Sequence, residues 1–182
     1  QFGDWLSFRA EESNPFDYVS AVTDKYLVAQ CFYANSVQIL INAAKALDNS
    51  SDVFKYSELL QRIKKAFMDE YVTPNGRLIS NTQTAYVLAL AFDMLPQSMR
   101  AKTADRLVVN IKNYKYHLTT GFLGTPYLCH VLSDNGYTDV AYELLLQETY
   151  PSWLYPVKMG ATTIWERWDG IKPDSTFQDP AM

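Results

Sequence analysis

Apolar residues recur every three or four positions along most of this chain, which is the spacing of amphipathic helices. Three successive stretches each contain two such segments, and they span residues 24–71, 82–114 and 124–148. Clusters of Pro, Gly, Asn, Asp and Ser, which favour turns, interrupt the pattern at residues 48–51, 73–76 and 134–136. We therefore expect an all-α chain built from three antiparallel helical hairpins, without strand-rich segments.

The apolar positions of each helix predict its buried face. In the first helix they are Tyr26, Leu27, Tyr33, Ala34, Val37, Leu40, Ile41, Ala44 and Leu47. In the second they are Phe54, Leu59, Leu60, Ile63, Phe67 and Tyr71. The third helix, expected over residues 82–95 and ended by Pro96, is nearly all small or apolar, so we expect it to be buried on more than one side.

Composition and charge exclude several classes of protein. With 48% hydrophobic and 20% charged residues, the chain can bury enough apolar surface to fold. Its 16 Lys and Arg against 20 Asp and Glu give a net charge of −4 without basic clusters, so we expect no nucleic-acid partner. Because no run approaches the roughly 18 to 20 apolar residues of a membrane span, we expect no membrane partner. The first five residues do not resemble a signal peptide, and the composition indicates no cellular compartment.

Cysteine and histidine are too scarce to indicate a metal centre. Cys31 and Cys129 lie in separate apolar patterns and are expected to pack in the core rather than to form a disulfide. His117 and His130 stand apart from each other and from any acidic cluster with metal-ligand spacing. We therefore expect no metal and no other cofactor.

The character of the sequence changes over residues 150–170. Two prolines between residues 150 and 157 favour a loop rather than a helix there. Residues 165–170 then bring together two tryptophans, two acids and an arginine. Such a mixture of rings and charges on a helical scaffold is typical of a binding or catalytic loop.

Glu166, between Trp165 and Trp168, is the candidate catalytic residue of this loop. A carboxylate between two indoles is expected to be partly desolvated. Inverting glycosidases use two carboxyl groups about 6.5–9.5 Å apart, one of which activates a water. Tryptophan faces pack on sugar rings. If the hairpins curve, the pair Asp4-Trp5 lies on the same rim of the helical fold as Glu166. The alternative is a surface ion pair among Glu166, Arg167 and Asp169, with the indoles in the core.

Five segments together resemble the catalytic domain of bacterial α-L-rhamnosidases of glycoside hydrolase family 78. The resemblance covers nearly the whole chain, and its most specific segment is the motif Thr-Ile-Trp-Glu-Arg-Trp at residues 163–168. The segments are residues 3–6, 82–90, 120–125, 150–155 and 160–170.

This resemblance implies an (α/α)6 barrel and an inverting reaction in which Glu166 is the general base. It places Trp5 in the rhamnose pocket, and we add Asp4, Trp165 and Trp168 as sugar-binding residues. The expected substrate is a terminal α-L-rhamnoside. The family's general acid belongs to a segment that precedes Gly-Asp-Trp and is not found in this sequence.

From the three hairpins we expect residues 1–182 to form a single partial domain, about half of the six-hairpin barrel. We expect such a fragment to be inactive alone. Part of its apolar surface should then contact missing segments of the parent chain or a second copy.

Two other functions remain open. The chain could belong to a sister α/α-barrel glycosidase that acts on another sugar, since indoles and a base do not specify the epimer. It could also be a helical-repeat interaction module without catalysis, in which case replacement of Glu166 would leave its function unchanged.

Overall fold

The computed structural model describes residues 3–8 and 22–178, which form seven α-helices and no β-strand. The helices are α1 (Lys25–Ala46), α2 (Ser50–Tyr71), α3 (Gln83–Ala91), α4 (Gln97–Asn113), α5 (Thr125–Asp134), α6 (Thr138–Leu145) and α7 (Leu154–Lys158). Two isolated antiparallel bridges join Val72 to Leu78 and Ile171 to Phe177. The ends of the expected domain, Gln1 and Met182, lie outside the described residues.

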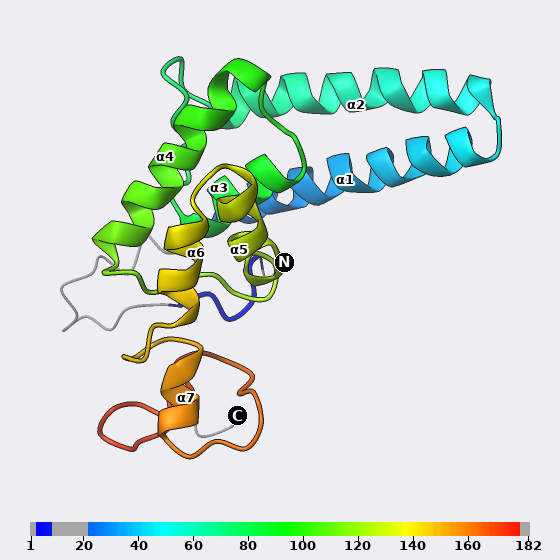
Figure 1. Cartoon of the computed structure of the whole chain (residues 1–182). Coiled ribbons are helices and arrows are strands. Elements are labelled where there is room, and N and C mark those ends of the chain that lie inside the picture. The colour runs from blue at the N-terminus through cyan, green and yellow to red at the C-terminus, as the bar shows by residue number, and fades with distance from the viewer. Residues whose placement is uncertain (1–2, 9–21, 179–182) are drawn as a thin grey trace.

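The first six helices pair as predicted, α1 with α2, α3 with α4 and α5 with α6. Helices α1 and α2 are 22 residues each and lie antiparallel as an arm that extends away from the other helices (Figure 1). The side chains of Asp24 and Asn49 cap the two helices, because they accept hydrogen bonds from backbone N–H groups of the first turn. Helix α2 begins at Ser50, within the turn cluster expected at residues 48–51.

The predicted buried face of α1 is only half right. Leu27, Ala34, Val37, Ile41 and Ala44 are buried, together with Cys31. The other predicted positions, Tyr26, Tyr33, Leu40 and Leu47, are exposed. These four are seven residues apart, so they form one exposed stripe along α1. Its residues Tyr26 and Tyr33 border α2 across an open groove.

Helix α3 occupies the centre of the fold, where it contacts α1, α4 and α5. All its residues from Gln83 to Leu90 are buried, which confirms the predicted burial on more than one side. It ends at Ala91 rather than at Leu95, because Asp93 adopts the left-handed conformation with φ 54°. The Asp93 carboxylate binds Lys64 of α2 and Arg100 of α4, which joins the two neighbouring hairpins.

The prediction of an unbroken loop after residue 150 is wrong, because Leu154–Lys158 form the one-turn helix α7. Pro156 lies in its first turn, where its missing N–H has no helical partner to lose. The rest of residues 150–170 is irregular.

Among the described helices, none combines the length and apolarity needed to cross a bilayer. The thiol of Cys31 is buried in the seam of the arm, and burial raises its pKa to about 12, so it stays protonated. Cys129 is half-buried, and both cysteines are free thiols.

Substitution of two phenylalanines of α2 tests which face of this helix stabilises the arm. Phe67 is fully buried with its ring 5.4 Å from that of Tyr71, whereas Phe54, also predicted to point inward, is 66% exposed. We expect Phe67→Ala to lower the free energy of unfolding by about 3–5 kcal/mol because it leaves a cavity. The matched change Phe54→Ala should alter it by less than about 0.5 kcal/mol. Urea unfolding measures both, and equal losses would contradict the packing described here.

Candidate active site

The loop of residues 119–124, which leads into α5, supports the N-terminal segment of residues 3–8. The N–H of Phe122 donates to the Trp5 carbonyl at 2.9 Å, and the N–H of Phe8 donates to the Thr119 carbonyl at 3.1 Å. A Cβ atom at Gly121 would lie 2.1 Å from the Trp5 carbonyl oxygen. Only glycine therefore permits this close approach of two backbones.

Asp4, a residue that is only 5% exposed, binds the same loop through its carboxylate. Its Oδ2 accepts from Thr84 Oγ1 at 2.5 Å and from the Gly121 N–H at 2.7 Å. Its Oδ1 accepts from the N–H groups of Leu123 at 2.8 Å and Gly124 at 3.2 Å. Four bonds use the roughly four acceptor positions that an ionised carboxylate offers.

Trp5, the neighbour of Asp4, keeps an indole that is 41% exposed while its carbonyl is fixed on the loop. The structure thus holds the backbone of Trp5 rigidly and leaves part of the ring accessible.

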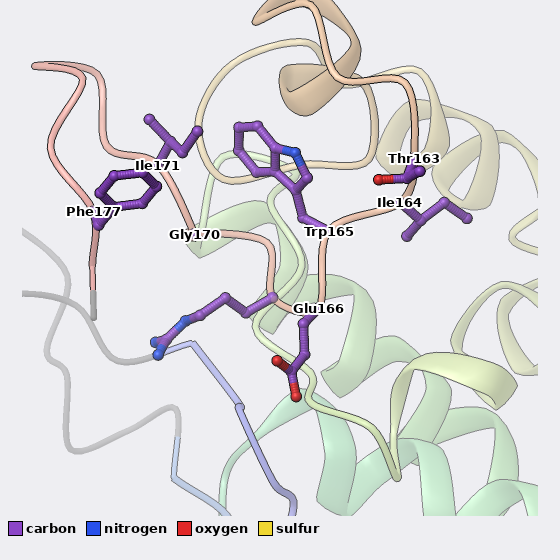
Figure 2. A pocket seen from close by; sticks show the side chains of 8 residues that line it. Thr163, Ile164, Trp165, Glu166, Gly170, Ile171 and Phe177 are labelled. Carbon is purple, nitrogen blue, oxygen red and sulfur yellow. The ribbon is translucent and has the colours of Figure 1, made fainter. Parts of the chain in front are cut away.

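Glu166 lines a pocket of about 300 Å³ formed by residues 163–167 together with Gly170, Ile171 and Phe177. Figure 2 shows this pocket, with Ile171 and Phe177 close together across their bridge. Glu166 is exposed, and among the described residues none forms a hydrogen bond or ion pair with its carboxylate. It is also the sole carboxylate among the described residues that line the pocket.

The expected position of Glu166 between two indoles is wrong. The side chains of Trp165 and Glu166 leave the backbone in opposite directions (Figure 2). Trp168 instead packs edge-on against Trp153, with ring centroids 5.2 Å apart. Its indole N–H donates to the Thr120 carbonyl at 3.1 Å, so Trp168 ties the loop that bears Glu166 to residues 119–124.

Arg167 and Asp169 form an ion pair, but not at the surface and not with Glu166. The guanidinium donates to both oxygens of Asp169, at 2.6 Å and 3.1 Å. Because the Asp169 side chain is only 3% exposed, this bidentate pair fixes the loop between residues 167 and 170.

The sequence did not predict an aromatic cluster that lies beside the pocket. The Tyr155 ring lies 5.3 Å from that of Tyr150 and 6.2 Å from that of Trp165, both edge-on. Burial, and then the negative charge of Asp174, raise the pKa of Tyr155. Helix α7 brings Trp153 and Tyr155 to this position, and the predicted loop gave no reason to expect it.

A second pocket, of about 250 Å³, lies beside the first and shares Thr163, Ile164 and Trp165 with it. Trp153 and Trp168 complete its aromatic wall. Among the described residues, no group of three or more His, Cys, Asp or Glu side chains is arranged to hold a metal ion.

Comparisons of the chain with a protein family, with related sequences and with solved structures agree with one another. Residues 1–181 match the family described as the bacterial alpha-L-rhamnosidase 6 hairpin glycosidase domain. An alpha-L-rhamnosidase of Streptomyces avermitilis is 45% identical over 181 residues, which are all of this chain and 16% of that protein. One of Alteromonas sp. is 41% identical over 187 residues, with 100% of this chain and 20% of that protein covered.

Among solved structures, the Streptomyces avermitilis alpha-L-rhamnosidase complexed with L-rhamnose superposes with a TM-score of 0.89 at 45% identity. The match covers 100% of this chain and 16% of that one. The predicted fold class, antiparallel helical hairpins of an (α/α)6 toroid, is confirmed by these matches and by the all-helical described residues.

Substitution of Gly121 tests whether residues 3–8 and residues 119–124 lie in contact. A methyl group there must displace the Trp5 carbonyl, so we expect Gly121→Ala to lower the free energy of unfolding by about 1–3 kcal/mol. Gly170→Ala is the matched control, because its Cβ would meet other atoms only at 3.5 Å or more. Thermal unfolding compares the two variants. Full stability of Gly121→Ala would show that residues 3–8 lie elsewhere.

Proposed function

Because the chain belongs to the bacterial α-L-rhamnosidase six-hairpin glycosidase family, we propose that the complete natural protein hydrolyses glycosides with a terminal α-L-rhamnosyl group. The chain spans 16% and 20% of the lengths of the two relatives, and the solved structure of one α-L-rhamnosidase carries L-rhamnose. A pocket of about 300 Å³ is at the lower end of the range for small-molecule sites, which suits one sugar ring.

The observation that carries a catalytic role for Glu166 is that this residue lines the pocket and that its carboxylate has no hydrogen-bond or ion-pair partner among the described residues. An unpaired carboxylate can accept a proton from a water molecule. In the proposed step, Glu166 takes that proton while the hydroxyl oxygen bonds to the anomeric carbon. The bond from that carbon to the leaving oxygen breaks on the opposite face of the sugar.

The leaving oxygen requires a proton from a second carboxylic acid. Asp169 is bound to Arg167 and Asp4 to four donors, so both are already engaged. We therefore propose that the general acid comes from another part of the complete protein, and that these 182 residues alone do not hydrolyse rhamnosides.

Trp5 and Trp165 are the two indoles that we propose for apolar contact with the sugar. Trp5 is partly exposed, and Trp165 lines the pocket with Glu166. The N–H of Trp168 and the carboxylate of Asp4 already bind within the protein, which supports a role in holding the site rather than in touching the sugar.

The family description names six hairpins, and the described residues form three. We propose that they make up about half of the domain. The exposed stripe of Tyr26, Tyr33, Leu40 and Leu47 on α1 would then pack against other hairpins of the same domain.

Glu166→Gln in the complete natural protein tests the proposed base. Glutamine keeps the shape of the side chain but cannot take the proton, so we expect kcat on an aryl α-L-rhamnoside to fall by about 10²–10⁴-fold. KM should change only a few-fold, because the contacts with the sugar remain.

The control is Glu143→Gln, an exposed glutamate of α6, which should keep the original rate. A Glu166→Gln protein with unchanged kcat would remove Glu166 from the chemistry. Binding of rhamnosides without any turnover by the unmodified protein would instead favour an interaction module.

The anomeric configuration of the first product tests whether water attacks the sugar on the face opposite the leaving group. Attack by water opposite the leaving group inverts the anomeric centre, so we expect β-L-rhamnose to appear before the α anomer. Proton NMR during the first minutes of hydrolysis distinguishes the two. The α anomer as first product would contradict inversion and require Glu166 to act as a nucleophile.

Sedimentation of the complete protein tests the stripe on α1. If other hairpins of the domain cover it, changing Leu40 and Leu47 to serine should destabilise the complete protein without altering its oligomeric state. A dimer that these changes dissociate would show that a second copy covers the stripe.

A further inference from the structure

The buried carboxylate of Asp4 joins three separate parts of the chain. It belongs to the N-terminal segment, and its four donors come from Thr84 in α3 and from the backbone of residues 121–124. The N–H of Gly124, the N-cap of α5, donates to Asp4 Oδ1, so Asp4 holds the residue at which α5 begins from more than a hundred positions away.

The loop that Asp4 holds contacts both Trp5 and the loop that bears Glu166. On one side the Phe122 N–H fixes the carbonyl of Trp5. On the other side the Thr120 carbonyl accepts the indole N–H of Trp168, which is two residues from Glu166. Residues 119–124 are therefore the common support of Trp5 and of the loop that bears the proposed base.

We propose that Asp4 is a positioning residue for rhamnoside hydrolysis, which sets the distance between the Trp5 indole and the Glu166 carboxylate by fixing residues 119–124. This inference rests on the proposed function of the site. It assigns to Asp4 no contact with the sugar and no proton transfer, since its acceptor positions are filled by protein donors.

Asp4→Asn in the complete natural protein tests this role. Asparagine keeps the shape but replaces one acceptor oxygen by a donor, which opposes two of the four bonds. We expect kcat to fall about 10- to 100-fold, because the base shifts relative to the sugar. The apparent pKa values of the pH–rate profile should stay unchanged, since Asp4 transfers no proton.

The second measurement is amide hydrogen exchange without substrate. In Asp4→Asn we expect faster exchange both in residues 121–124 and in residues 163–169. Asn49→Ala is the matched control, because it removes the N-cap of α2 at the turn of the arm, remote from the loop (Figure 1). It should lower thermal stability and leave kcat unchanged.

Three results would overturn the proposal. Faster exchange confined to residues 121–124 with normal kcat would make Asp4 purely structural. A higher KM with unchanged exchange would make it a sugar contact. A kcat loss of the same size in Asn49→Ala would make it an effect of stability alone.

If Asp4→Asn does not fold, Thr84→Val is the alternative variant, because it removes one of the four donors to Asp4. Measurements of kcat and of amide hydrogen exchange should then show smaller changes in the same direction. The proposed function fails separately, if the unmodified protein does not cleave rhamnosides. The exchange of residues 163–169 then still decides whether Asp4 positions them.

Discussion

The hydrogen bonds around residues 119–124 are the constraint on which the candidate site depends. This short loop binds Gln83 of α3, the N-terminal segment and the Trp168 indole at once, and the buried Asp4 carboxylate accepts hydrogen bonds from three of its backbone N–H groups. Four donors converge on this one buried carboxylate. Their effect is to hold together parts of the chain that helix packing alone leaves unconnected.

The helical hairpins could be predicted from sequence because each depends on local information. Apolar periodicity, turn residues and caps such as Asp24 are all encoded within a few positions. The exposed stripe of α1 could not be predicted in the same way. Tyr26 and Leu27, or Leu40 and Ile41, are neighbours about 100° apart on the helix, and only the placement of the other helices decides which one is covered. The end of α3 was missed because Asp93, not Pro96, makes the turn.

The site shows the same division between local and distant information. The sequence motif identified Glu166 and Trp5, and the pocket contains Glu166. The sequence did not reveal that Trp165 and Glu166 point in opposite directions, nor that Trp168 packs on Trp153. The donors of Asp4 are 80 to 120 positions away from it, so no spacing rule could have found them. Residues that hold a site are thus harder to recognise than residues that line it.

We propose that Glu166 faces the anomeric carbon of a bound rhamnoside across one water molecule. The most direct measurement is a crystal structure of the complete natural protein, as the Glu166→Gln variant, with an uncleaved rhamnoside. We expect the side chain of residue 166 and a water to lie on the face of the sugar opposite the leaving group, with the Trp5 indole against the ring. A sugar bound beyond the reach of residue 166 and a bridging water would contradict it.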